Sequence, residues 1–189
     1  MKRGRGKDGS LTGGTGDVSP QFFNMSQTQS AADTTTSGTF PVPIQRLPAG
    51  GKAQVMELLR IYWTRSAMPV SASTTEASDV IGFSLTTSNF GTTTPTNGLA
   101  EPRVIYSRLD SNRSAFTAGG TYMFQDVNQN GSVDVTDGAG HGVLIATDNI
   151  FLQVQSTTTG AANNVNMKLL YRWKNVRIEE YIGIVQSQQ

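Results

Sequence analysis

Short runs of alternating apolar and polar residues, broken by turn-forming residues, constrain this chain of 189 residues more than any other feature. The clearest run is VNMKLLYRW, in which every second residue is apolar: Val165, Met167, Leu169, Tyr171 and Trp173. In an extended strand, the side chains of alternate residues point to the same side of the sheet. The pattern therefore predicts a strand with one face in a hydrophobic core.

Seven further segments have the same character, and the residues between them are rich in Gly, Asn, Asp and Pro. In NIFLQVQS, for example, Ile150, Leu152 and Val154 share one face. Many short strands with regular turn signals are typical of an all-β sandwich. The predicted strands are 53–63, 79–86, 102–109, 120–127, 142–147, 149–156, 165–174 and 177–185.

The segment AQVMELLRIYW, residues 53–63, is compatible with two structures. Helical spacing joins Val55, Met56, Leu59, Tyr62 and Trp63, whereas a period of two joins Val55, Leu59, Ile61 and Trp63. We predict a strand, because β-branched and aromatic residues gather at its end and every other element of the chain is a predicted strand. A helix here would instead make the domain an α+β fold.

Long connections favour an eight-stranded double-sheet jelly roll over an up-and-down barrel, whose strands are joined by tight hairpins. SAMPVSASTTEAS and SNFGTTTPTNGLAEP are two of these connections, and they are rich in Thr, Ser and Asn but poor in charge. Loops of this composition can be buried between like surfaces without leaving ions unpaired. We therefore expect loops such as those with Thr93 and Thr159 to form contacts between subunits.

The amino-terminal segment KRGRGK places Lys2, Arg3, Arg5 and Lys7 among glycines, as in a nucleic-acid-binding arm. Residues 1–9 hold four of the fifteen basic residues and one of the fourteen acids, so the rest holds eleven bases and thirteen acids, a net charge of −2. The alternative is a disordered terminus whose charges keep the protein soluble. Composition changes near residue 38, so we expect a flexible arm over 1–38 and one jelly-roll domain over 39–189.

Large aromatic side chains each allow two interpretations. Phe22 and Phe23, within the arm, either anchor it to the inner face of the domain, which we favour, or stack on bases. Trp63 and Trp173 stand at the ends of apolar strands, where packing in the core is the favoured role and base stacking the alternative.

Four phrases of the sequence resemble one family: KRGRGK, KAQVMELLRIYW, GHGVLIATDNIFLQVQS and LLYRWKNVRIEEYIGIVQSQQ. The chain resembles the single-jelly-roll capsid proteins of small circular Rep-encoding single-stranded DNA viruses, of the unclassified, environmental type. The resemblance implies an icosahedral shell of identical subunits in the virion, assembled in the host cell, with the arm facing a single-stranded genome.

The arm is shorter and poorer in arginine than in many members of that family. Either further inward-facing bases assist it, or counterions do, or the shell forms without a genome. The bases available for this are Arg46, Lys52, Arg172, Lys174 and Arg177.

The segment DVNQNGSVDVTD, residues 126–137, resembles the calcium loops of EF-hands and dockerins. Oxygen donors alternate around Gly131, whose flexibility permits the sharp turn that aims them at one ion. The candidate ligands are Asp126, Asn128, Asn130, the Ser132 carbonyl, Asp134 and Asp137. The last ligand is Asp instead of Glu and the flanks do not look helical, so we expect weak Ca²⁺ binding, with an ordinary polar turn as the alternative.

Nothing in the sequence indicates an enzyme, and we assign no catalytic residue. The chain has no cysteine, its one histidine is His141 in a glycine-rich run, and no serine stands in a nucleophile elbow. Glu179 and Glu180 are adjacent on a predicted strand, so they would point to opposite faces. No apolar run is long enough to insert into a membrane.

We therefore predict a structural capsid protein whose partners are its own copies and a single-stranded genome. It requires no cofactor, although Ca²⁺ is possible. The alternatives are a calcium-dependent β-sandwich binding module and a monomeric protein that binds single-stranded nucleic acid.

Overall fold

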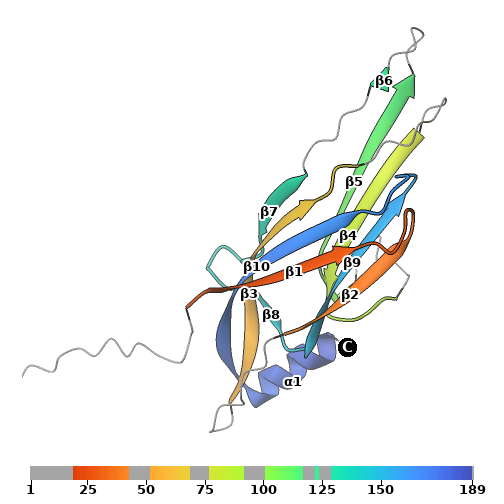
Figure 1. Cartoon of the computed structure of the whole chain (residues 1–189). Helices are drawn as coiled ribbons and strands as arrows, with labels where there is room; N and C mark the ends of the chain where they lie inside the picture. Colours follow the sequence, from red (N-terminus) through yellow and green to blue (C-terminus); the bar gives the residue numbers. More distant parts are fainter. Residues whose placement is uncertain are drawn as a thin grey trace, which may run out of the picture.

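Two antiparallel β-sheets pack face to face in the computed structural model (Figure 1), which describes residues 19–42, 52–68, 77–91, 101–116, 122–123 and 129–188. In spatial order, sheet A holds β1 (Gln21–Thr28), β10 (Asn164–Arg177) and β3 (Lys52–Arg65). Beyond β3 lie two shorter strands that both pair with it, β7 (Asn130–Asp134) and β8 (Val143–Ile145). Sheet B holds β2 (Thr35–Pro41), β9 (Asn149–Thr157), β4 (Ala77–Thr86), β5 (Val104–Phe116) and β6 (Tyr122–Met123). Helix α1 (Ile178–Ser187) follows β10.

The strand order is that of a jelly roll, which confirms the predicted fold class. The chain alternates between the sheets, so that β1 and β3 lie in sheet A while β2 and β4 lie in sheet B. It returns in the same way, with β7 and β8 in sheet A, β9 in sheet B and β10 in sheet A. β7 and β8 share one position beside β3. Apart from β6, a two-residue strand paired with the end of β5, the strands therefore fill eight places.

The jelly roll begins earlier than the sequence suggested. Strands β1 and β2 lie largely within residues 1–38, which we had assigned to a flexible arm, so that assignment is wrong from Gln21 onward. Both are edge strands with few buried residues, and the apolar alternation that reveals a strand is correspondingly weak. Residues 1–18 lie outside the described part of the chain.

The segment 177–185 was predicted as a strand, but from Ile178 onward it is helix α1. Tyr181, Ile184 and Val185 are its partly buried residues, and Gln188 directly beyond it is buried. These positions follow helical spacing. Glu179 and Glu180 therefore lie in the first turn of α1, where negative charge is favourable, and not on opposite faces of a strand.

Gln188 fastens the end of α1 to both sheets. Its main-chain carbonyl accepts hydrogen bonds from Thr87 and Ser88, which follow β4 of sheet B. Its side chain accepts a hydrogen bond from the Ala146 amide and donates one to the Leu144 carbonyl, both at β8 of sheet A. The helix end thus bridges the two layers of the sandwich.

The core lies between the sheets and contains the two rows of side chains that the sequence predicted. Ile150, Leu152 and Val154 of β9 are fully buried in it. They face the predicted row of β10, which comprises Val165, Met167, Leu169, Tyr171 and Trp173. The packing roles favoured for Trp63 and Trp173 are confirmed, since both side chains are less than 5% exposed.

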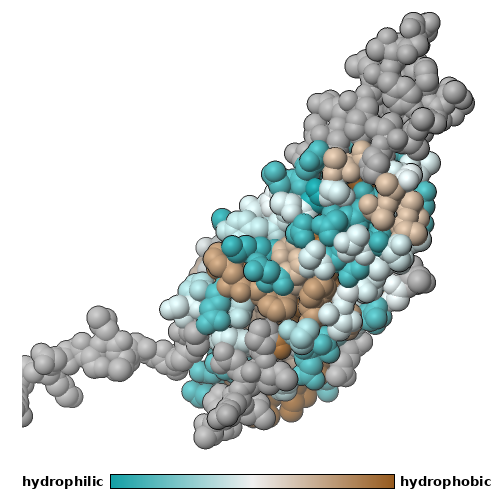
Figure 2. All heavy atoms as spheres, viewed as in Figure 1, coloured by the Kyte–Doolittle hydropathy of each residue, from teal (hydrophilic) through white to brown (hydrophobic). Residues whose placement is uncertain are grey.

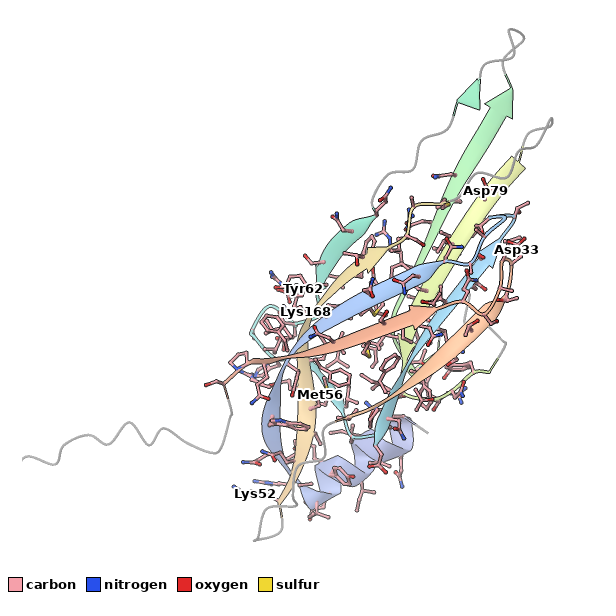
Figure 3. The ribbon with its side chains drawn as sticks, in the orientation of Figure 1. Asp33, Lys52, Met56, Tyr62, Asp79 and Lys168 are labelled. Atoms are coloured by element: carbon pink, nitrogen blue, oxygen red, sulfur yellow. The ribbon has the colours of Figure 1, made fainter. Side chains whose placement is uncertain are left out.

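Strand β3 is a strand, as predicted, but its inward residues differ from those expected. Leu58 pairs with Tyr171 and Arg60 pairs with Leu170, so Leu59 is a one-residue bulge. A bulge shifts the alternation by one position. Met56 and Leu58 therefore join Ile61 and Trp63 in the core (Met56 is labelled in Figure 3), and Leu59 does not. Val55 lies instead in a small outer cluster beneath α1.

A buried ion pair also joins the two sheets. Arg65 of β3, whose side chain is inaccessible to solvent, donates to Asp110 of β5 at 2.9 Å. Arg108 of β5 donates to the other oxygen of Asp110 and lies over the Trp63 ring at 4.4 Å. Both charges of the pair are therefore satisfied within the sandwich.

Thr159 belongs to a buried polar network and not to an exposed loop surface. Its hydroxyl contacts Ser156 and Asn163, and its main-chain amide donates a hydrogen bond to the Asp33 carboxylate at 2.9 Å. The side chain has 0% exposure, so its predicted role in subunit contacts is wrong. Thr93 lies outside the described residues.

Gly131 provides a test of how closely β7 packs on the core. A methyl group added at Gly131 would lie 2.6 Å from the Trp63 ring. We expect Gly131→Ala to destabilise the domain by about 1–3 kcal/mol, because the ring is held within the core. Chemical denaturation would measure this change.

Gly183 of α1 is the matched control. An added methyl group there has no heavy atom within 4 Å. Gly183→Ala should raise stability, by at most about 1 kcal/mol, through helix propensity. Equal effects of the two substitutions would contradict the close packing of β7 against Trp63.

Candidate functional site

The outer face of sheet A carries aligned rows of side chains that point away from the core. One row runs Phe22–Leu170–Arg60–Asp134, the next Asn24–Lys168–Tyr62–Ser132, and the third Ser26–Asn166–Thr64–Asn130. Figure 2 shows hydrophobic surface beside hydrophilic surface over the middle of the molecule in this view. These rows lie on the β7 side of the Leu59 bulge, whereas the outer face on its other side is covered by α1.

A shallow groove of about 480 Å³ crosses the second and third rows. Among the described residues, its lining has one cation, Lys168, and no carboxylate. Figure 3 shows Tyr62 and Lys168 next to each other on this face, as expected from their pairing in the β3–β10 register. The other outward groups of the lining are neutral hydrogen-bonding side chains: Asn24, Ser26, Thr64 and Asn166.

Phe22 borders this groove and is 53% exposed. Its ring lies 6.3 Å from that of Tyr62 at an interplanar angle of 59°, and the Lys168 ammonium lies 4.1 Å from its centroid. An exposed ring with a cation over one face is a cation–π contact. β1, β3 and β10 thus bring together three residues that are far apart in the sequence.

The two aromatic residues of the predicted arm have different environments. Phe23 packs against the core from β1, so the favoured interpretation as an anchor is confirmed for this residue. Phe22, one position earlier, points to the outer face. The alternation in QFFNMSQT was the signal that could have separated them, because Phe23 and Met25 share the inner face.

Five of the twelve residues of the predicted calcium loop form a strand. Asn130–Asp134 forms β7, paired with β3, and Gly131 has no positive φ. Alternate residues of a strand are about 6.8 Å apart, so Asn130 and Asp134 are about 13 Å apart along β7, too far to share one ion. The alternating oxygen donors are the outer positions of an edge strand, and Gly131 makes room for Trp63. Asp126 and Asn128 lie outside the described residues.

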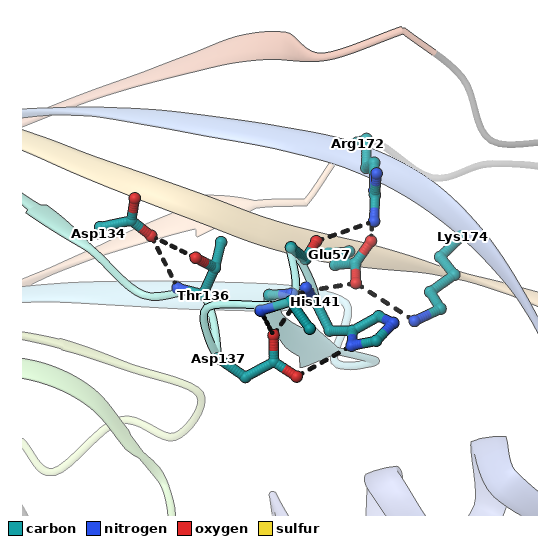
Figure 4. A network of polar contacts seen from close by, with 10 residues as sticks. Glu57, Asp134, Thr136, Asp137, His141, Arg172 and Lys174 are labelled. Carbon is teal, nitrogen blue, oxygen red and sulfur yellow. Dashed lines mark hydrogen bonds and ion pairs between the residues drawn. The ribbon is translucent and has the colours of Figure 1, made fainter.

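The two remaining acids of the motif have separate partners (Figure 4). Asp134 accepts hydrogen bonds from Thr136, and its pair with Arg60 is 2.9 Å long. These contacts lower the pKa of Asp134 to about 2, the Thr136 hydroxyl contributing most. Asp137 is held by His141, whose Nδ1 lies 2.9 Å away, and this contact above all lowers the pKa of Asp137 to about 2.

No alternative metal centre replaces this motif in the described ranges. Nowhere in them do three His, Cys, Asp or Glu side chains gather closely enough to hold a metal ion.

Glu57 is a buried acid on the outer side of β3, covered by the loop before β8 (Figure 4). One of its oxygens lies 2.5 Å from Arg172 Nε, and the other accepts hydrogen bonds from Lys174 at 3.2 Å and from the Gly142 amide at 3.0 Å. Burial raises the pKa of Glu57, but these three donors outweigh it and leave the pKa below its ordinary value. Arg172 and Lys174, two of the bases expected to assist the arm, are thus occupied by Glu57.

The outer face of sheet A is nevertheless locally positive. Its outer positions carry four cations and two carboxylates: Arg60, Lys168, Arg172 and Lys174 against Glu57 and Asp134. The net charge of −2 calculated for the chain after residue 9 therefore does not describe this face. Lys2, Arg3, Arg5 and Lys7 lie outside the described residues, as does Arg46. No helix of the described part is long and apolar enough to cross a membrane.

Comparison with known proteins gives similarity in fold only. No protein-family model matches the chain, and neither does any curated protein. Among solved structures, the human polyomavirus 7 VP1 pentamer is 8% identical with a TM-score of 0.49, and 82% of this chain covers 96% of that chain. Human polyomavirus 12 VP1 in complex with 3'-sialyllactosamine is 10% identical with a TM-score of 0.46, covering 84% of this chain and 100% of that chain. Sequence identities and TM-scores this low do not allow the role of those proteins to be assigned to this chain.

The environment of Glu57 predicts how the stability of the protein depends on this residue and on pH. Glu57→Gln keeps the shape but removes the charge that pairs with Arg172 and Lys174, so we expect a loss of about 1–3 kcal/mol at neutral pH. Because the pKa of Glu57 is lower in the folded state, this contribution is full above its ordinary pKa of 4.5 and is lost as pH falls through the folded pKa. The difference between wild type and variant should therefore shrink below that pH in urea titrations.

Glu101→Gln is the control for this measurement. Glu101 pairs with Arg103, but both side chains are about a third exposed. Its removal should change stability much less, because exposed ion pairs are weak. A difference between wild type and Glu57→Gln that is constant from pH 7 to pH 3 would contradict the assigned ionisation.

Proposed function

We propose that this protein is a structural capsid protein that self-assembles into a small icosahedral shell around a single-stranded nucleic-acid genome. The observation that carries the proposal is the course of the chain at its amino-terminal side. The basic segment with Lys2, Arg3, Arg5 and Lys7 leads into β1, which is the edge strand of the locally positive sheet A in a jelly roll. One surface of the subunit thus suits a polyanion, and others are left for contacts between copies.

Exposed apolar side chains outside the groove support the proposal that copies of the chain contact one another. Ile178 and Ile182 of α1, four residues apart on one side of the helix, are 41% and 49% exposed. Leu109 on sheet B is 61% exposed. Adjacent exposed apolar residues on a helix favour association with another protein surface, and in a symmetric shell that surface belongs to another copy.

The sequence resemblance narrows the proposal to the capsid of a small circular Rep-encoding single-stranded DNA virus. Its location would be the virion, and the host cell during assembly. A non-enzymatic role follows from the same proposal. A monomeric protein that binds single-stranded nucleic acid is the second candidate, which the groove on sheet A favours, and the two differ in their state of assembly.

Electron microscopy of the purified protein tests the proposal directly. We expect uniform closed particles. Ile182→Lys should keep the melting temperature of the subunit, because the side chain is exposed, but should lower the yield of particles, because a charge buried between copies is costly. Gln186→Lys, at an exposed polar position of the same helix, is the control.

Monomers at every protein concentration would refute the shell. Normal particles from Ile182→Lys would instead show that α1 is not a contact, while leaving the shell in place.

Deletion of residues 1–9 tests the role assigned to the arm. We expect the deletion to leave the fold and the particles intact, because these residues precede β1, but to lower the nucleic-acid content. The ratio of absorbance at wavelengths specific for nucleic acid and protein measures this content in purified particles. An unchanged ratio would remove the arm from genome binding.

A further inference from the structure

We propose that the groove on the outer face of sheet A binds unpaired bases of a single nucleic-acid strand. In this arrangement bases stack on Phe22 and Tyr62, while Lys168 contacts a phosphate. The inference deepens the proposed function, since it assigns a second contact with the genome besides the arm. Its evidence is the geometry of three strands and does not depend on assembly.

The first step of the argument is the exposure of the aromatic rings. Four large hydrophobic side chains of the described residues are exposed, and Phe22 is the aromatic one among them. Phe23 beside it packs against the core. The Phe22 ring lies 6.3 Å from that of Tyr62 and is tilted by 59° against it, so the two rings are not stacked face to face on each other. Stacking on aromatic faces accepts every base and is the usual means of holding single strands.

The second step is charge. Lys168 lies in the groove over the Phe22 ring, and no carboxylate is among the described residues that line the groove. The other three cations of this face are already paired, Arg60 with Asp134 and both Arg172 and Lys174 with Glu57. Lys168 is therefore the outward cation of sheet A best placed to meet a phosphate, and the groove as a whole complements an anion.

The third step is the nature of the remaining lining. Asn24, Asn166 and Thr64 offer amide and hydroxyl groups, which can donate and accept hydrogen bonds with bases and sugars without a preference for one sequence. A duplex keeps its bases stacked on one another, so it cannot use the exposed rings. The chemistry of the groove accordingly selects unpaired strands.

The position of β1 connects the groove with the basic arm. Lys7 is fourteen residues before Gln21 in the sequence, and β1 supplies one wall of the groove. A segment of this length reaches at most about 50 Å. The arm can thus bind phosphates on either side of the bases held in the groove.

Fluorescence anisotropy with the full chain tests the inference, using labelled oligothymidine and an abasic strand of the same length. We expect the wild type to bind oligothymidine roughly tenfold more tightly than the abasic strand, at a salt concentration that weakens phosphate contacts. Phe22→Leu keeps an apolar side chain but removes the ring, so it should abolish most of this difference and leave abasic binding unchanged. Lys168→Gln should weaken the binding of both strands and reduce the salt dependence of the affinity by about one counterion.

Thr39→Ala, at an exposed position of β2 on the other sheet, is the control and should change neither affinity. Equal affinity of the wild type for the two strands would overturn the inference, as would unchanged oligothymidine binding by Phe22→Leu. Circular dichroism of each variant ensures that a loss reflects the groove and not unfolding.

Photocrosslinking with bromouracil-containing oligonucleotides provides a second, independent measurement. We expect crosslinks in the peptides that contain Phe22 and Tyr62. Crosslinks confined to residues 1–9 or to sheet B would contradict the proposal. Base-dependent binding without closed particles would reject the shell but retain the groove, whereas particles with no effect of Phe22→Leu would do the reverse.

Discussion

The antiparallel pairing of β3 with β10, interrupted by one bulge, determines both faces of sheet A. The register places Met56, Leu58, Ile61 and Trp63 in the core even though they do not follow a single period. By shifting the alternation at Leu59, the bulge also divides the outer face into a part beneath α1 and a part open to solvent. The groove lies on the second part.

Two carboxylates within the sandwich are each surrounded by several hydrogen-bond donors. Glu57 receives hydrogen bonds from two cations and one amide, and Asp110 receives them from two arginines on different sheets. Burying an isolated charge is costly, so any register that separated these groups from their partners would be destabilised. They therefore specify how the loop before β8 lies on β3 and how sheet A lies on sheet B.

The sequence predicted the parts of the fold in which side-chain period and structure agree. Leu152 and Met167 were placed correctly because their strands are central and half buried. The helix was missed because Ile178, Ile182 and Val185 are β-branched, and only packing against β3, β8 and β10 decides in favour of α1. The motif around Gly131 resembled a calcium loop because alternating oxygen donors are also what an edge strand presents to water. The groove could not be predicted, because the β1–β10–β3 register alone brings Phe22, Tyr62 and Lys168 together.

The strand order has a consequence for how the chain is made. β1 and β3 do not pair with each other, and each pairs with β10, the last strand of the described chain. During translation, the edges of β1 and β3 that pair with β10 must therefore stay unpaired until β10 has been made. Sheet A is complete only when β10 inserts between them. Phe22 and Tyr62 can meet only after that insertion. A nascent or half-folded subunit lacks the groove, so the groove distinguishes finished subunits from unfinished ones.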